Sequence, residues 1–158
     1  MDRRQNFQGG NPPSAPPPLS DKDLRAIIVD GDPEALVNAA KQIGRTLYEK
    51  NLTTSQIRNF FGAVREIEMN WPVGSESQRE GDAQREKEAR RKLLLLKPKL
   101  AYYVGKEKGS SKAALDHLEK VLSPAIDLAK DDRTRFANFV EFFEAILAYH
   151  KYHGGREQ

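Results

Sequence analysis

Residues 136–155 constrain the fold of this 158-residue chain more than any other part of its sequence. Apolar and aromatic residues recur there at the spacing of one helix face, which predicts a helix that buries aromatic bulk. Gly154 and Gly155 are expected to end this helix, because glycine readily adopts the left-handed conformation of a helix terminus. We therefore expect this helix to carry the core. Its predicted buried face comprises Phe136, Phe139, Val140, Phe143, Ile146, Leu147 and His150.

Composition narrows the class of protein further. The formal net charge is +3 and the isoelectric point lies near 9.1, a mild basic bias that permits contact with nucleic acid but does not require it. The chain has no Cys, which excludes disulfides and thiol chemistry and favours a reducing compartment. Its apolar runs, such as residues 93–96, are far shorter than the roughly 18 residues that a membrane span needs. We therefore expect a soluble, cytoplasmic protein.

Two segments are expected to lie outside the compact part of the molecule. Residues 1–19 are rich in Pro and Gly and have too few apolar residues to offset the entropy cost of ordering, so they predict a disordered tail. Residues 74–90 form a charged insert, interpreted as a polar loop followed by the start of a helix. Residues 20–155, with this insert, are expected to form a single helical-bundle domain.

Capping residues predict where the helices begin, because Ser, Thr and Asp side chains accept hydrogen bonds from the first N–H groups of a helix. Pro98 is expected to kink its helix or to begin a new one, and Pro124 to kink the next helix. Nothing resembles a strand, so the sequence predicts an all-α bundle of about five main helices, preceded by a short first helix. The predicted caps are Ser20 with Asp23, Asp32 before Pro33, Thr53 with Gln56, Ser110 or Ser111, and Asp131 or Asp132.

Helical geometry predicts a basic face interleaved with aromatic residues over residues 93–108. At about 100° per residue, four apolar side chains share one side of this helix, while lysines and tyrosines share the other. Such a face suits RNA phosphates and stacked bases, although basic residues on helix surfaces are more often simply solvated. Arg58 and Arg65 share a side of an earlier helix, and Arg133 and Arg135 open the last one. The apolar side holds Leu93, Leu96, Leu100 and Val104; the other holds Lys99, Tyr102, Tyr103 and Lys106, with Lys92 nearby.

Two further groups of residues offer weaker chemistry. His150 and His153 have a spacing that allows two metal ligands, but His150 continues the buried stripe, where a core histidine is the commoner role. Glu141 and Glu144 share a helix side, but no nucleophile or phosphate-binding loop accompanies them, and Glu144 could instead bind an arginine inside the bundle. We therefore expect no catalytic residues, no metal and no cofactor.

Three segments, taken in this order, resemble one known family. They are residues 52–61 (LTTSQIRNFF), 96–107 (LKPKLAYYVGKE) and 144–155 (EAILAYHKYHGG). In an all-helical chain without Cys they resemble the small subunit of type III-A CRISPR effector complexes, the Csm complexes. The resemblance spans most of residues 33–155, and the combination of the first and last segments makes it specific. Lys106 stands where the family often has Arg, which keeps the charge but loses the bidentate fork.

The resemblance implies a non-catalytic five-helix bundle that serves antiviral defence. Several copies would stack along the inner face of the complex, beside the backbone subunits that hold the guide RNA. They would help to hold the duplex of guide RNA and target RNA through basic residues. Cleavage of the target would belong to the backbone subunits, and DNA cleavage and cyclic oligoadenylate synthesis to the large subunit. Within the matching segments, the resemblance implies this RNA-contacting role for Arg58, Lys97, Lys99 and Lys106. With the residues found from the pattern, the predicted RNA-binding set is Arg58, Arg65, Lys97, Lys99, Lys106, Arg133 and Arg135.

Two other functions stay open at this point. The first is a pure protein–protein scaffold that stacks on copies of itself and on other subunits, with its basic residues merely solvated. The second is an enzyme that uses His150 and His153 with a metal, and a chelator-sensitive RNase activity would support it. The sequence leaves open how many copies assemble and whether guide, target or both strands are contacted.

Overall fold

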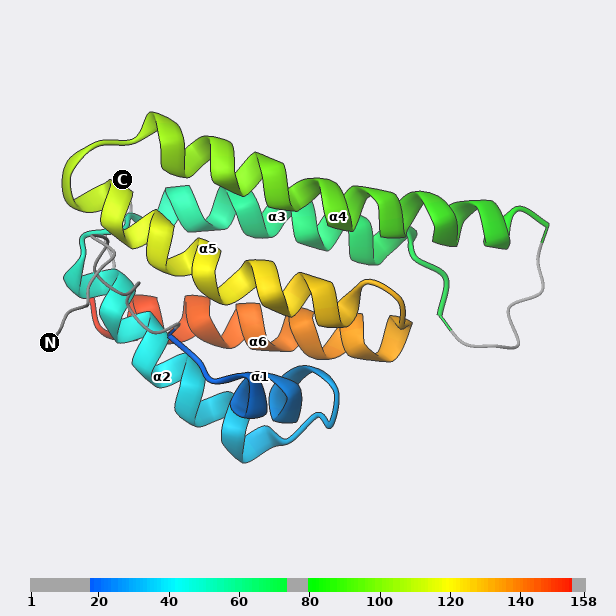
Figure 1. The fold of residues 1–158 in the computed structure, drawn as a ribbon, viewed down its shortest axis with the longest axis horizontal. Helices are drawn as coiled ribbons and strands as arrows, with labels where there is room; N and C mark the ends of the chain where they lie inside the picture. Colours follow the sequence, from blue (N-terminus) through cyan, green and yellow to red (C-terminus); the bar gives the residue numbers. More distant parts are fainter. Residues whose placement is uncertain (1–17, 74–79, 155–158) are drawn as a thin grey trace, which may run out of the picture.

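Helix α6 (Arg133–Tyr152) is the element on which four of the other five described helices pack. The computed structural model describes residues 18–73 and 80–154, and this part of the chain contains six α-helices and no strand (Figure 1). α6 contacts α1, α2, α3 and α5, whereas α4 contacts only α3 and α5 among these helices. The predicted all-α class is confirmed, and the short first helix precedes five longer ones. The other helices are α1 (Asp21–Ile28), α2 (Pro33–Glu49), α3 (Thr54–Asn70), α4 (Asp82–Lys106) and α5 (Gly109–Ala129).

Capping side chains fix most of the helix starts where the sequence predicts them. Ser20 accepts a hydrogen bond from the Asp23 N–H, and Asp32 and Asp132 each accept from two N–H groups of the following turn. Thr53 and Gln56 form a complete capping box, in which each side chain accepts from the other residue's backbone N–H. These local hydrogen bonds depend only on neighbours in sequence, which is why the pattern finds them.

The predicted cap of α5 is wrong. The helix begins at Gly109, its N-cap is Lys108, and no side chain caps it, so neither Ser110 nor Ser111 has the predicted role. The chain turns from α4 into α5 over two residues, and Gly109 adopts a positive φ of 71° in this turn. Ser110 and Ser111 therefore lie within the first turn of α5, after its N-cap position.

Both internal prolines lie within continuous helices. Pro98 is inside α4 and Pro124 is inside α5, so Pro98 does not begin a new helix. Each proline removes one hydrogen bond that its N–H would otherwise donate to the preceding turn. α4 is the longest helix, and its first turns extend beyond the ends of its neighbours (Figure 1).

The core is a stack of aromatic side chains along α6. The Phe136 ring stacks on Trp71 at the end of α3, with 4.9 Å between ring centroids, and Phe143 contacts both Phe60 and Phe61. Phe142 is also fully buried, although the predicted single face did not include it. The reason is that helices cover α6 on several sides, so its buried surface is wider than one stripe.

Gly44 sets the closest approach between α2 and α6. A Cβ atom at Gly44 would lie 2.8 Å from the backbone nitrogen of His150 and 2.8 Å from Cβ of Tyr149. Both are atoms of the facing helix that cannot rotate away, so only glycine allows the two helices to pack at this distance.

The ends of the predicted domain fall partly outside the described residues. Residues 1–17 of the predicted tail (1–19), residues 74–79 of the predicted insert (74–90) and Gly155 all lie there. Within the described range, Leu19 packs against the core and α6 ends at Tyr152, followed by Gly154 with a φ of 107°. No helix in the described ranges combines the length and the apolar character needed to cross a membrane.

We predict that Gly44→Ala lowers the free energy of unfolding by about 1–3 kcal/mol or more, because α2 and α6 must move apart. Gly62→Ala is the matched control: it lies within α3, and a Cβ there meets no atom within 4 Å. The control is expected to raise the free energy of unfolding by about 0.5–1 kcal/mol. Chemical denaturation of both variants measures this difference, and equal stability of the two would refute the close approach.

Candidate nucleic-acid interface

The outer face of α4 carries a continuous exposed stripe of lysines and apolar residues. Its members alternate three and four residues apart, so they share one side of the helix. All are exposed, because Leu93, Leu96 and Leu100 turn the opposite side of α4 into the core. We call this surface the α4 stripe; it consists of Lys92, Leu95, Lys99, Tyr102 and Lys106.

Lys106 and Tyr102 form the C-terminal end of the α4 stripe, and Tyr103 lies beside them. The Lys106 amine lies 5.7 Å from the ring centroid of Tyr102 and 5.2 Å from that of Tyr103. The attraction between a cation and an aromatic ring holds this amine beside both rings. Tyr102 is 65% exposed, whereas Tyr103 is half-buried and packs against the core. The end of the stripe thus combines a positive charge with aromatic surface.

Two predicted arginines lie on α3, the helix that packs beside α4. Arg58 and Arg65 are both exposed and seven residues apart, so they share a side of α3. Arg65 forms an ion pair with Glu68, with 2.7 Å between Nη1 and Oε1. Since this pair is largely exposed, it stabilises the helix by well under about 1 kcal/mol and leaves other guanidinium N–H groups available.

Lys97 is held by a neighbouring helix. Its Nζ lies 2.7 Å from Oδ1 of Asp127 on α5, an ion pair that joins α4 to α5. The side chain is also less exposed than those of the α4 stripe. The structure therefore gives Lys97 a role in helix packing, and it does not belong to the stripe.

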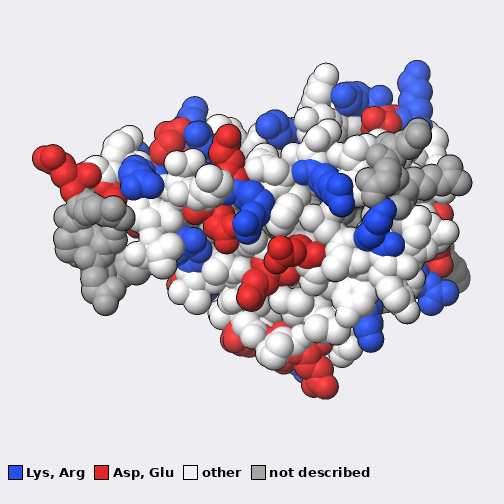
Figure 2. Space-filling view, turned by 180° about the vertical axis from the view of Figure 1, so that it is seen from behind, with Lys and Arg blue, Asp and Glu red and all other residues white. Residues whose placement is uncertain are grey.

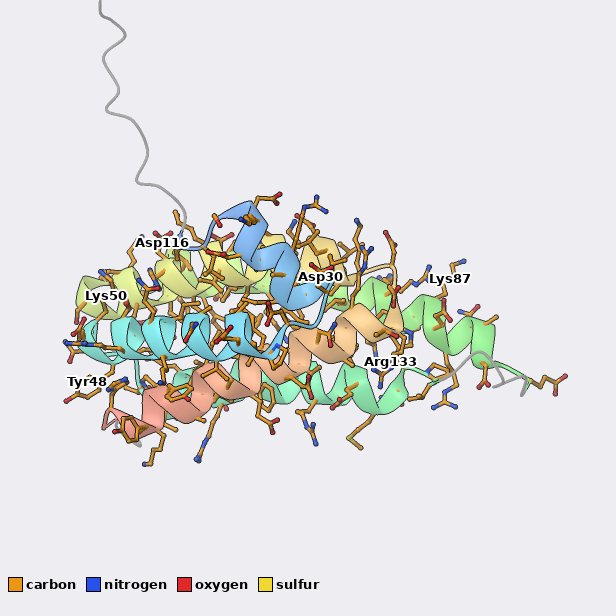
Figure 3. All side chains as sticks on the ribbon, turned by 90° about the horizontal axis from the view of Figure 1, so that it is seen from below. Asp30, Tyr48, Lys50, Lys87, Asp116 and Arg133 are labelled. Atoms are coloured by element: carbon orange, nitrogen blue, oxygen red, sulfur yellow. The ribbon has the colours of Figure 1, made fainter. Side chains whose placement is uncertain are left out.

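Arg133 and Arg135 lie at the other end of the bundle. Arg133 donates from Nε to the Trp71 carbonyl oxygen at 3.3 Å and covers the Phe136 ring, while Arg135 donates to the Leu128 carbonyl oxygen at 3.4 Å. Both are half-buried. Figure 3 shows Arg133 far from Tyr48 and Lys50, which mark the end of the bundle where α4 stops. The seven predicted residues therefore do not form one patch.

The α4 surface also has an apolar part that the sequence pattern did not predict. Leu94 is 39% and Leu95 48% exposed, and they line a shallow groove of about 540 Å³ that continues to Lys87 and Arg91. The prediction treated residues 93–96 as one apolar run and assigned no role to its two middle leucines. The helical spacing of Leu94 with Lys87 and Arg91 was the signal that could have identified the groove.

Charge is distributed unevenly over the surface. Figure 2 shows Lys and Arg mostly in the upper half of that face, mixed with Asp and Glu at the left, and a further group of Asp and Glu at the lower centre. Where basic residues gather, a weakly basic protein can offer a locally positive surface to an anionic partner.

The histidines at the end of α6 do not resemble a metal site. His150 is fully buried and its Nε2 lies 2.6 Å from the Leu52 carbonyl oxygen, which identifies Nε2 as the protonated nitrogen. His153 is only half-buried. Among residues 18–73 and 80–154, no three His, Cys, Asp or Glu side chains gather closely enough to hold a metal ion. Glu141 and Glu144 are exposed, so Glu144 does not bind an arginine inside the bundle.

Burial lowers the pKa of His150 below its ordinary value of 6.5; the bond to Leu52 opposes this shift, and the nearby Lys151 and His153 add to it. Protonation would place a hydrogen on Nδ1, which is buried without a hydrogen-bond partner. Burial and Lys50 also lower the pKa of His117. In both cases the unfolded chain binds a proton more readily than the folded one.

We therefore predict that the free energy of unfolding is constant above about pH 6.5 as far as these groups are concerned, and falls as the pH drops below it. His150→Gln keeps a side chain that can donate to Leu52 but cannot be protonated. Denaturant titrations at several pH values between about 7.5 and 5 are expected to give a weaker pH dependence for this variant. His117→Gln provides the comparison, and an unchanged slope for both would contradict the prediction.

A family model described as Csm2 Type III-A matches residues 30–156. This range contains α2 to α6 and every residue of the α4 stripe. Comparisons with curated proteins and with solved structures found no match.

Proposed function

Because this chain belongs to the Csm2 family, the small subunit of the type III-A CRISPR Csm complex, we propose that it is a non-catalytic subunit that helps to hold the duplex of guide and target RNA. The α4 stripe is the observation that carries this proposal. Lys92, Lys99 and Lys106 are spaced seven residues apart, which places successive charges about 10 Å apart along the helix axis. A row of lysines at this spacing can contact successive phosphates along an RNA backbone.

Such a contact needs no sequence recognition by the protein. Base pairing with the guide already selects the target, so a subunit can act through phosphates and 2′-hydroxyl groups alone. Lysine suits this role as a mobile point charge without directional demands. The low net charge of the chain is consistent with a subunit that contributes only part of the contact surface.

The predicted residues outside the α4 stripe are weaker candidates for RNA contact. Arg58 is exposed on α3, the helix that packs beside α4, so it is the next candidate for RNA contact. Lys97 and Arg65 form ion pairs with carboxylates, and Arg133 and Arg135 donate hydrogen bonds to backbone carbonyl oxygens. RNA would therefore compete with these contacts inside the protein. We expect substitution of these residues to change stability or local packing more than RNA affinity.

The decisive test is target-RNA binding by the reconstituted complex that carries Lys99→Glu together with Lys106→Glu. Affinity is expected to fall, and the slope of log K against log salt to become shallower by about 0.7–0.9 for each phosphate that the variant no longer neutralises. The matched control is Lys22→Glu with Lys41→Glu, which makes the same charge change on α1 and α2, helices that do not contact α4.

Assembly is measured in the same preparations by size-exclusion chromatography. An assembled complex that carries the stripe variant but keeps wild-type affinity and salt slope would refute RNA contact through α4. An equally large fall in affinity in the control would show that overall charge, and not the stripe, is responsible.

A scaffold role is the second candidate, and the exposed pair Leu94 and Leu95 favours it. Their groove lies on the half of α4 away from Lys106, so protein and RNA contacts can coexist on one helix. Since the chain belongs to a multisubunit complex, we propose a neighbouring subunit of that complex as the occupant of this groove.

Leu94→Glu with Leu95→Glu tests this second candidate. Both side chains are partly exposed and glutamate favours helices, so the free chain is expected to keep its stability to within about 1 kcal/mol. The complex is expected to recover less of this variant in pull-down experiments. Met69→Glu, at a position 77% exposed on α3, is the control. Wild-type recovery of the double variant would exclude this groove as an assembly surface.

A further inference from the structure

A small cavity opens beside the end of the α4 stripe. It has a volume of about 140 Å³ and lies between the start of α3, the end of α4 and the first half of α5. One water needs about 10–15 Å³ of such space, so the cavity has room for a group of roughly ten heavy atoms. Its floor is apolar and consists of Phe60, Leu100, Leu115 and Leu118, all buried side chains.

One aromatic ring and four polar side chains complete the lining. Tyr103 offers a half-buried ring, and the Lys106 amine lies 5.2 Å from that ring's centroid. The Gln56 carbonyl oxygen accepts from Thr53 in the capping box, so Gln56 offers its amide N–H groups to the cavity. Asn59 can donate or accept, and the Glu107 carboxylate can only accept.

This combination selects a flat, partly polar ligand. An apolar floor and an aromatic ring favour a planar ring system, while a few donors and an acceptor at the rim satisfy its edge. The nearby lysine favours a ligand that carries an anionic group outside the cavity. A nucleobase attached to a phosphate-bearing backbone meets all three requirements.

We propose that this cavity binds one unpaired nucleobase of an RNA strand whose adjacent phosphate lies at Lys106. The inference deepens the proposed function and rests on it, since Lys106 belongs both to the α4 stripe and to the cavity. It assigns base stacking to Tyr103, because Tyr102 does not line the cavity.

The rim also implies a preference among bases. The exocyclic amino group of cytosine donates a hydrogen bond, which the Glu107 carboxylate accepts. Uracil presents a carbonyl oxygen at the same place, and two acceptors repel each other. The cavity is therefore expected to prefer cytosine to uracil, and Glu107→Gln is expected to reduce this preference because an amide can also donate.

The test uses the full chain and three labelled RNA octamers of equal charge: oligocytidylate, oligouridylate and an abasic octamer. At low salt, oligocytidylate is expected to bind about tenfold more tightly than the abasic octamer, as is typical of one stacked base. Tyr103→Leu keeps a bulky apolar side chain and is expected to abolish this difference without changing the salt slope. Tyr102→Leu is the matched control and is expected to retain the difference.

Asn59→Ala provides a second variant at an exposed position, and it is expected to reduce the same difference even if Tyr103→Leu proves unstable in thermal unfolding. Equal binding of abasic and base-bearing RNA by the wild-type chain would overturn the cavity proposal. The proposed duplex contact is judged separately, by the Lys99 and Lys106 variants in the complex. A second result would also overturn the cavity proposal: the Tyr103→Leu chain fails to assemble into the complex but still discriminates between the octamers. The cavity would then be assigned to a side chain of a neighbouring subunit.

Discussion

The close packing of α2 on α6 is the constraint on which the rest of this structure depends. Gly44 lies against the backbone of Tyr149 and His150, and His150 reaches from α6 to the Leu52 carbonyl beyond the end of α2. With α1, α3 and α5 also packed on it, α6 buries its aromatic side chains on several sides. Within the described residues, α4 does not contact α6 and packs outside this arrangement, on α3 and α5.

The outer position of α4 explains the character of its surface. Because α4 packs only on α3 and α5 among the described helices, it needs one apolar side and exposes the other over its full length. Lys99, Tyr102 and Lys106 occupy that side toward the C-terminus, and Leu94 and Leu95 occupy it near the middle of the helix. A single helix can thus present one surface suited to an anionic polymer and another suited to a protein.

Membership of the Csm2 family, the small subunit of the type III-A CRISPR Csm complex, gives a context for the RNA and subunit contacts proposed for these surfaces. A guide that selects the target by base pairing removes the need for sequence readout by the protein. A helix with regularly spaced charges is then sufficient for backbone contact. The cavity beside Lys106 adds a place on this surface where a base could be distinguished.

The sequence by itself determined the helical class, the caps of α1, α2, α3 and α6, and the basic and aromatic side of α4, because each depends on residues a few positions apart. Only the tertiary structure decided which basic residues remain outside the stripe. Lys97 meets Asp127 30 residues away, and His150 meets Leu52 98 residues away. The cavity likewise needs three helices to meet. No local pattern encodes such contacts, because they arise when helices distant in sequence pack together.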